Sequence, residues 1–327
     1  MESKTCTDIQ GGAVKVSVIL LAYNQAPYIA QAIDSILMQH TDFAFEVLIG
    51  DDASTDETGS IIRGYAERYP GVVIPVIRDS NLGATRNLYD LIERARGSYL
   101  AYLEGDDYWC EATKLQQQVD FLESNLHYIA CTHQIRCVDH AGTLLDEKVS
   151  WISEKEDYSF EDFNGILLAG HGNSLVHRNI FLGTEGRYRD LITMHPMIAD
   201  RTLCLLLASY GPIHQIQKVF GCYRRPTADQ NSATATLFIN NPRKILDDYG
   251  FTKQLEAYAK EELKRDVDFS PHKKELLFSA VWTFLRKPNK NNWNTAKEML
   301  RMEHSKGFVL YFFAQFMRKA ADKLKRG

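Results

Sequence analysis

Two clusters of carboxylates follow apolar stretches of the chain. Glu104, Asp106 and Asp107 form one cluster, and Asp51 and Asp52 form the other. Neighbouring carboxylates repel one another unless a cation balances them, and Mg²⁺ and Mn²⁺ prefer carboxylate and phosphate oxygens. The cluster of Glu104, Asp106 and Asp107, which comes second along the chain, therefore predicts a site for Mn²⁺ or Mg²⁺ that is completed by substrate phosphates. In the first cluster along the chain, the Asp52 carboxylate can accept a hydrogen bond from the N–H edge of a nucleobase.

Each cluster also has a simpler interpretation. A short acidic run can be a solvated turn, and an Asp that follows a strand can cap the next helix. Ser54 and Asp56 are well placed for such a cap. Both roles are compatible, because Ser54 or Asp56 can cap the helix while Asp52 contacts a ligand.

The elements that must position these acids alternate between strands and helices. Apolar runs predict buried strands at residues 16–22, 45–49, 72–77 and 98–103. Helical spacing predicts helices at residues 27–37, 57–68 and 84–96, with Gly97 ending the last one. This alternation predicts a mostly parallel sheet with helices on both faces. Both clusters then lie beyond the carboxyl ends of strands, where ligands of such sheets bind.

The regular alternation of strands and helices changes after residue 108. This change indicates a domain in two halves. Helices are expected at 114–125 and 199–210, and strands at 128–138 and 213–223. A polar stretch follows at 227–236, and the remainder is mostly helical in pattern. We therefore expect a catalytic domain at 14–226, with halves 14–110 and 111–226, and a helical C-terminal extension at 227–327.

Composition excludes several classes of protein. The 327 residues are 45% hydrophobic and 24% charged, which is typical of a globular domain, and the net charge of -4 gives no basis for nucleic-acid binding. The six cysteines form no C-x-x-C pair, which argues against a structural zinc site. The N-terminus has no apolar signal segment and no apolar run is long enough to cross a bilayer. We expect a cytoplasmic protein with reduced thiols, or one at the cytoplasmic membrane face.

The ordered set of motifs resembles glycosyltransferase family 2, the inverting enzymes with the GT-A fold. The resemblance covers about residues 14–226, and each motif alone is a weak signal. It rests on Ala22, Tyr23 and Asn24 after the first strand, residues 51–56, Asn81, Leu82 and Gly83 with Arg86 and Asn87, and residues 104–107. The resemblance implies an α/β GT-A fold and a nucleotide-sugar donor, with UDP as the nucleotide.

On the nucleotide side, the resemblance implies roles for the loops after the first two strands. Tyr23, flanked by Ala22 and Asn24, would stack on the base. Asp52 would bind the N–H edge of the base, and Arg86 would lie near the base or the diphosphate. Ala53 replaces the Gly that is usual there.

Near the diphosphate, the resemblance implies a metal site. Asp106 would contact the ribose or the metal, and Asp107 would bind the metal that bridges the diphosphate. Glu104 stands where an Asp is more usual, but a carboxylate is retained. Arg224, at the end of a predicted strand, would lie near the donor diphosphate, since Arg suits bidentate phosphate recognition. A surface basic pair with Arg225 is the alternative.

Inversion also needs a base that takes the proton of the acceptor hydroxyl as it attacks. The family places an Asp at the start of a helix in the second half of the domain, and Asp200 occupies that place without the Glu that often precedes it. Helix capping is its alternative role. Glycines on both sides of His171 allow close approach to a ligand, so His171 is a candidate for the diphosphate or acceptor. A structural His is the alternative.

Other nucleotide-using enzymes fit less well. An oxidoreductase would need G-x-G-x-x-G after the first strand, and a P-loop enzyme would need G-x-x-x-x-G-K-[ST]; the sequence has neither. A metal-dependent nucleotidyltransferase remains an alternative, although it normally shows a Gly-rich, basic loop after the first strand. A catalytically inactive nucleotide-sugar-binding module is another, and the intact carboxylates argue against it.

The acceptor implied by the resemblance is a glycan or lipid-linked molecule in cell-surface polysaccharide assembly. The C-terminal segment 308–326 is relevant to that acceptor, because it combines an apolar stripe with basic residues. The stripe consists of Val309, Phe312, Phe313, Phe316, Ala320 and Leu324. Such a helix can lie on an anionic membrane surface. Packing on the protein itself is the alternative.

Overall fold

The computed structural model describes residues 13–184, 186–196, 198–226, 240–302, 311–312 and 315–316. The chain separates into two compact units. Unit 1 comprises Met1–Phe163 and Leu167–Ile239, and unit 2 comprises Asn164–Ile166 and Asn240–Gly327. Each unit has its own core and is described by itself.

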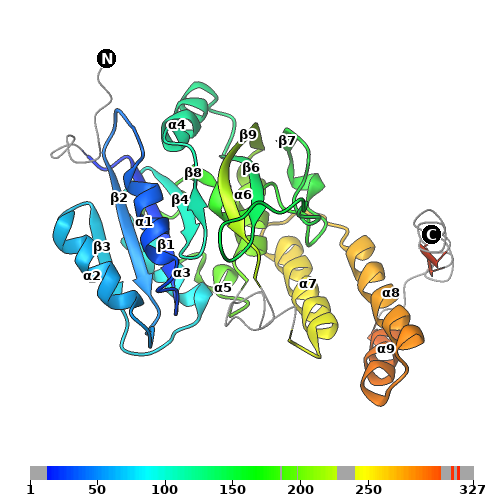
Figure 1. Ribbon diagram of the computed structural model, residues 1–327. Helices are drawn as coiled ribbons and strands as arrows, with labels where there is room; N and C mark the ends of the chain where they lie inside the picture. The colour runs from blue at the N-terminus through cyan, green and yellow to red at the C-terminus, as the bar shows by residue number, and fades with distance from the viewer. Residues whose placement is uncertain are drawn as a thin grey trace. The chain divides into compact units, whose positions relative to one another are not determined.

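A mixed sheet runs through unit 1 (Figure 1). Its strands lie in the order β3-β2-β1-β4-β8-β6-β9-β5, and β7 pairs with β9. Strands β3, β2, β1 and β4 are mutually parallel, whereas β8 runs antiparallel to β4 and β6. The strands are β1 (Val16–Ala22), β2 (Phe45–Asp51), β3 (Val73–Ile77), β4 (Tyr99–Glu104), β5 (Tyr108–Trp109), β6 (Ala130–Val138), β7 (Asp157–Tyr158), β8 (Val176–Arg178) and β9 (Ile213–Arg224).

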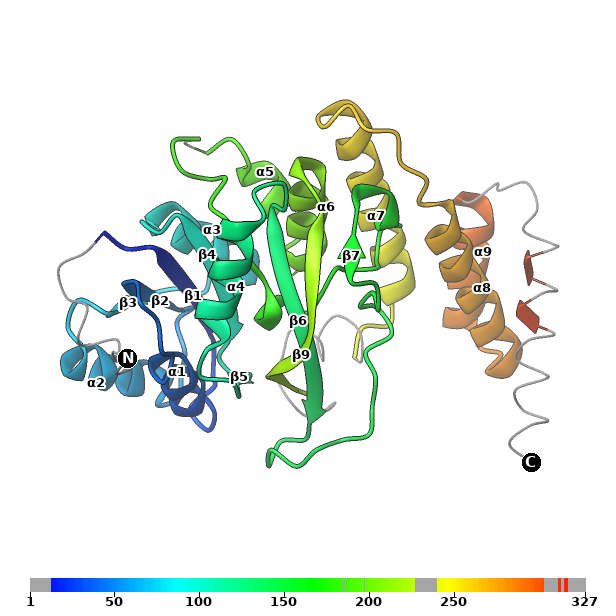
Figure 2. The same ribbon diagram turned by 90° about the horizontal axis from the view of Figure 1, so that it is seen from above.

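Helices cover both faces of this sheet (Figures 1 and 2). They are α1 (Ile29–Leu37), α2 (Thr58–Arg68), α3 (Ala84–Arg94), α4 (Lys114–Ser124), α5 (Arg189–Ile192) and α6 (Asp200–Tyr210), with short 3₁₀ turns η1 (Phe160–Asp162) and η2 (Gly172–Ser174). Helices α1, α2 and α4 share one buried cluster with alternate residues of β1, β2 and β4. Helix α3 contacts β1 and β2 on the other face, next to α5 and α6. The predicted α/β architecture, with a mostly parallel central sheet, is confirmed.

Helix α3 ends at Arg94, before the predicted boundary at Gly97. The next residues bond to the strands instead of continuing the helix. Arg96 N donates to Glu46 Oε1 at 2.9 Å, and Gly97 N donates to Ser17 Oγ at 2.8 Å. A Cβ on Gly97 would lie 2.5 Å from Ser17 N, so only glycine allows this approach. These bonds lie at the amino ends of β1 and β2, opposite the acidic clusters.

Unit 2 is helical in its described part. It contains α7 (Lys244–Glu261), α8 (Ser270–Arg286) and α9 (Lys290–Met302). Its core consists of Leu246, Tyr249, Leu276, Leu277, Ala280 and Met299. Among the residues described, no helix is long and apolar enough to cross a membrane.

Most of the predicted C-terminal apolar stripe lies outside the described residues: Val309, Phe313, Ala320 and Leu324. The two members that are described pack on α8. The ring centroids of Phe312 and Phe278 are 5.3 Å apart, and those of Phe316 and Trp282 are 5.8 Å apart. At these two positions the apolar stripe therefore packs against aromatic side chains of α8.

Candidate active site

The loop after β1 is held by the loop after β2. Asn24 N donates to Ser54 Oγ at 2.9 Å, and Thr55 N donates to Asn24 Oδ1 at 2.8 Å. Asn24 adopts a left-handed backbone with φ of 52°, which Asn tolerates better than most residues. Ala22 is buried at the end of β1, and the adjacent Tyr23 side chain is 38% exposed. The interlocked loops therefore present the Tyr23 ring at the sheet edge with surface free for stacking.

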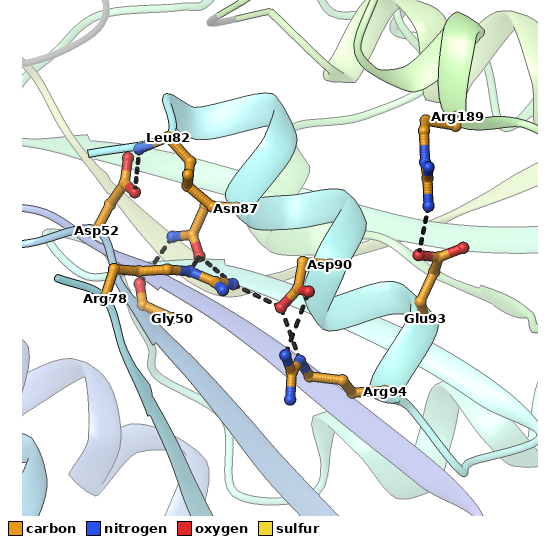
Figure 3. Close-up of polar contacts among 9 residues, drawn as sticks. All are labelled: Gly50, Asp52, Arg78, Leu82, Asn87, Asp90, Glu93, Arg94 and Arg189. Carbon is orange, nitrogen blue, oxygen red and sulfur yellow. Dashed lines mark hydrogen bonds and ion pairs between the residues drawn. The ribbon is translucent and has the colours of Figure 1, made fainter. Parts of the chain in front are cut away.

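Both carboxylates of the first acidic cluster accept hydrogen bonds from nearby loops. Asp52 Oδ1 accepts from Leu82 N at 2.8 Å (Figure 3). Asp52 Oδ2 accepts from Gly83 N at 2.9 Å. Asp51 Oδ1 accepts from the backbone N–H of Ser54 at 3.1 Å and from its hydroxyl. Asp52 thus fixes the loop that leads into α3. Asp56 Oδ1 accepts from Thr58 N at 3.0 Å, but the N-cap of α2 is Glu57, whose side chain makes no cap hydrogen bond, so the expected cap at Ser54 or Asp56 is not formed.

A polar row on α3 fixes this helix against β2 and β3 (Figure 3). Asn87 Nδ2 donates to Gly50 O at 2.9 Å, and Arg78 Nη2 contacts Asn87 Oδ1 at 3.2 Å and Asp90 Oδ2 at 2.6 Å. A Cβ on Gly50 would lie 2.4 Å from Asn87 Oδ1, so glycine is required there. The row leaves Arg86 exposed in the first turn of α3, where it is free to meet a ligand.

The second acidic cluster crowds carboxylates from two halves of the sequence. Asp106 Oδ1 is buried and has no hydrogen-bond partner among the described residues. The side chain of Glu104 is open to solvent at the end of β4. The surrounding protein nevertheless displaces much of the water that would stabilise the charged form of Glu104. This desolvation, together with the charges of Asp106 and Asp200, raises the pKa of Glu104 to about 8. Asp200 is therefore near enough to Glu104 for its charge to act on that carboxylate.

Asp107 is buried and held by two donors. Its Oδ1 accepts from Arg224 N at 2.8 Å, and its Oδ2 accepts from Asn173 Nδ2 at 2.7 Å. Burial, and then the charges of Asp106 and Glu104, nevertheless raise its pKa well above the usual range. Each carboxylate oxygen keeps a second lone pair for another ligand. The two donors therefore orient the Asp107 carboxylate and leave lone pairs on both oxygens for another ligand.

These acids fit a metal only if a substrate completes the coordination. Within the described part of the chain, no group of three His, Cys, Asp or Glu side chains could hold a metal alone. Mg²⁺ is commonly bound by one or two carboxylates together with substrate phosphates. The unpartnered Asp106 Oδ1 and the oriented Asp107 carboxylate match that pattern.

Asp200 is the first residue of α6, and Ala199 is the N-cap. Its Oδ1 accepts from the adjacent Arg201 N at 2.8 Å, which differs from a cap bond to the second or third helical N–H. The side chain of Asp200 has exposed surface. The protein around it still displaces water from the carboxylate, and this desolvation raises the pKa of Asp200. An accessible carboxylate of raised pKa is suited to accept a proton.

His171 lies beside Asp107, with 3.8 Å between His171 Nδ1 and Asp107 Oδ2. Burial lowers the pKa of His171 to about 4, so the ring is neutral at physiological pH. Nδ1 accepts from Asn173 N at 3.3 Å, which leaves the ring proton on Nε2. The Tyr223 ring packs on it at a centroid distance of 4.3 Å. Burial and packing fit the structural alternative, and the substrate role stays a prediction.

Arg224 holds the site together through its guanidinium. The group stacks over the Tyr28 ring at 4.4 Å. Its N–H groups donate at 2.8–2.9 Å to Asp106 O, Asp139 O, His140 O and Gln31 Oε1. Arg224 therefore clamps the segment that carries Asp106, and its contact with a donor diphosphate remains a prediction.

Sequence reasoning missed Asn173 as a site residue. It is fully buried and contacts Asp107. The only signal was its position after the His171 motif, and a single polar residue in such a stretch does not reveal a partner 66 positions away.

Comparison with known proteins identifies the family. The model of Glycosyl transferase family 2 matches residues 17–183. An uncharacterized protein of Mycobacterium tuberculosis is 37% identical over 213 residues, which cover 64% of this chain and 58% of that protein. Chondroitin synthase of Escherichia coli is 28% identical over 225 residues, 68% of this chain and 30% of that protein. The chain thus spans less than two thirds of the length of either relative.

The fold is shared with a solved glycosyltransferase. The crystal structure of TarS residues 1–349 from S. aureus with UDP-GlcNAc aligns with a TM-score of 0.60 at 17% identity, over 88% of this chain and 80% of that one. At this identity the likeness shows the GT-A fold alone. The family model covers just over half of the chain, which shows that the chain belongs to glycosyltransferase family 2.

Proposed function

We propose that the chain transfers a sugar from a UDP-sugar to a glycan or lipid-linked acceptor, with inversion at the anomeric carbon. The observation that carries this proposal is that Asp200 lies near enough to Glu104 for its charge to act on that carboxylate. A base for the acceptor and a cluster for the donor diphosphate would then share one site. We assign the catalytic domain to residues 14–226 and a helical extension to 227–327.

On the donor side, the exposed Tyr23 ring stacks on the base, flanked by Ala22 and Asn24. Asp52 holds the Leu82 loop and meets the base through its remaining lone pairs. Arg86 approaches from the first turn of α3. The TarS structure of the same fold contains UDP-GlcNAc, which makes UDP-sugars the first donors to test.

At the diphosphate, Asp106 and Asp107 would hold Mn²⁺ or Mg²⁺, and the positive charge of the metal would favour the ionised form of Glu104 beside them. Such a metal neutralises the charge that develops on the departing UDP. Arg224 keeps Asp106 in place through the Asp106 carbonyl. The neutral His171, whose Nδ1 lies 3.8 Å from Asp107 Oδ2, would offer its Nε2–H to the diphosphate or the acceptor.

On the acceptor side, Asp200 takes the proton of the acceptor hydroxyl while its oxygen attacks the anomeric carbon. The bond between that carbon and the diphosphate breaks, and UDP leaves with the bonding electrons. The relatives named chondroitin synthase and putative teichuronic acid biosynthesis glycosyltransferase support a polysaccharide as the acceptor.

A nucleotide-sugar screen tests the proposal. The full chain is incubated with UDP-, GDP- and ADP-sugars in the presence of Mn²⁺, with and without EDTA, and the products are weighed by mass spectrometry. We expect release of UDP that EDTA stops. Release of pyrophosphate instead would indicate nucleotidyl transfer, and nucleotide binding without any turnover on added glycans would indicate a binding module.

Asp200→Asn tests the base. The substitution keeps the shape of the side chain but removes its basicity, so turnover should fall by about 10²–10⁴-fold while donor affinity stays nearly unchanged. An equal loss of donor binding would place Asp200 on the donor side.

Membrane contact through residues 308–326, at the cytoplasmic face, belongs to the same proposal. The basic residues near the C-terminus are expected to favour anionic vesicles. Co-sedimentation of the full chain, and of a version ending at Gly307, with anionic liposomes at low salt tests it. If both versions stay in the supernatant, the segment is a packing element.

A further inference from the structure

Lys114 carries an ionisable group in the interior of unit 1. The side chain is fully buried at the first residue of α4, and burial lowers its pKa well below the usual range. Its Nζ has no hydrogen-bond partner among the described residues. Even where ordered water bridges such a group, an apolar side chain of similar length would be buried at lower cost. The stability of the fold therefore does not explain the residue.

A short series of contacts leads from Lys114 to the acidic cluster. Lys114 Nζ lies 3.7 Å from the centroid of the Trp109 ring. Trp109 Nε1 donates to Asn173 O at 2.8 Å, and Asn173 Nδ2 donates to Asp107 Oδ2 at 2.7 Å. All three contacts are buried, so water does not screen them.

Several buried polar atoms near Asn173 also suggest a link between Lys114 and this residue. Its Oδ1 is unpartnered within the described part of the chain, as are Gln118 Oε1 and His133 Nε2. A Cβ on Gly221 would lie 3.0 Å from His133 Cε1 and 3.3 Å from Asn173 Oδ1, so both side chains border this glycine. Lys114 lies near enough to His133 for a charge on one to disfavour a charge on the other. Asn173 Oδ1 and Lys114 Nζ thus both belong to the buried polar groups around His133.

We propose that Lys114 is a positioning residue for Asp107. Its amino group makes the interior polar on the Oδ1 side of Asn173. It also contacts the Trp109 indole, which donates to the main-chain carbonyl of Asn173. Both effects keep the Nδ2 side of the amide turned to the Asp107 carboxylate. The inference rests on the proposed function, in which Asp107 binds the metal and the donor diphosphate.

Lys114→Met separates this role from a purely structural one. Methionine keeps the length of the side chain and removes its polar end. Thermal unfolding gives the stability, and calorimetric titration of UDP in the presence of Mn²⁺ gives the affinity without requiring turnover. We expect a Tm equal to or above that of the wild type, and UDP affinity that is about tenfold weaker, the loss typical when a group that orients a metal ligand is removed.

Leu122→Met is the matched control, because Leu122 is fully buried on the same helix. It should leave UDP affinity unchanged. A Lys114→Met protein whose Tm falls together with its affinity would make Lys114 a structural residue. Unchanged affinity would also overturn the proposal. If the wild type itself does not bind UDP with Mn²⁺, the proposed function fails first, and the role of Lys114 fails with it.

A double-mutant cycle tests the route through Asn173. Asn173→Ala removes the side chain through which Lys114 is proposed to act, so adding Lys114→Met should weaken UDP binding no further. Residues on one route show such non-additivity. Additive losses would mean that Lys114 acts elsewhere and would overturn the proposal.

Discussion

The two acidic clusters lie beyond strand ends of the same sheet, yet their surroundings differ. Asp51 and Asp52 accept hydrogen bonds from the loops around them, and Asp52 uses both of its oxygens in this way. In the other cluster, Asp106 Oδ1 has no partner among the described residues, and burial together with neighbouring charge raises the pKa of Asp107. The first cluster organises loops, whereas the second gathers carboxyl groups whose ionised forms its own protein environment does not balance.

This difference shows that acids at strand ends can have two separate roles, in the stability of the fold and in the binding of a cation. A carboxylate surrounded by N–H donors gives stability to the fold. A carboxylate surrounded by other carboxylates costs stability until a cation arrives. Substitutions in the two clusters should therefore affect stability in opposite directions, and those in the second should affect activity most.

The largest effect is expected from Asp107→Asn. The substitution removes a charged metal ligand of the proposed site, so turnover should fall by about a hundredfold or more. The fold should be as stable as the wild type or more stable, because a buried charge is lost and Asn173 can turn its free Oδ1 to the new amide. Activity with Mn²⁺ and thermal unfolding are measured on the same sample. Near-normal turnover would show that Asp107 does not bind the metal.

Asp52→Ala should act mainly on stability. Leu82 N and Gly83 N lose their shared acceptor, and unpaired backbone donors cost about 1–3 kcal/mol. The loop before α3 also loosens, so donor affinity should weaken while turnover at saturating donor changes less. Urea unfolding and donor titration measure the two effects. Unchanged stability would mean that the contrast between the clusters is wrong.

Glu104→Gln should change how stability depends on pH. The pKa of Glu104 is raised from 4.5 to about 8, so the folded protein binds more protons than the unfolded chain between these values. By linkage, this residue makes stability fall as pH rises through that window. The Gln variant should therefore match the wild type at about pH 4.5 and gain stability relative to it up to about pH 8, without metal. Chemical unfolding at several pH values measures the difference, and a constant difference would contradict the raised pKa.

The smallest effect is expected from Ala53→Gly in the loop of the first cluster. Ala53 has a φ of 61°, a left-handed conformation that costs a non-glycine residue about 1–2 kcal/mol. Glycine removes that cost but adds entropy to the unfolded chain, so a net gain of about 0.5 kcal/mol is expected. Ala66→Gly, within α2, is the control and should destabilise. Urea unfolding measures both variants, and a loss of stability in Ala53→Gly would show that the loop is relaxed.

The sequence by itself determined the order of strands and helices and the edge at which the acids lie. Buried apolar runs such as residues 16–22 and 45–49 read as strands from local pattern alone. Parallel strands bring their carboxyl ends to one edge, so the positions of Asp52 and Asp107 beyond that edge followed from the same pattern. Local patterns sufficed because each of these features depends on neighbouring residues.

Only the tertiary structure decided which groups surround each acid. Leu82 N reaches Asp52 from 30 positions away, and Asn173 reaches Asp107 from 66 positions away. The burial of Lys114 against Trp109 likewise contradicts what a lysine at a helix start would suggest. These contacts join segments that are distant along the chain, and hydrogen bonding and hydration, which set the charge state of a carboxylate, depend on such neighbours rather than on sequence position.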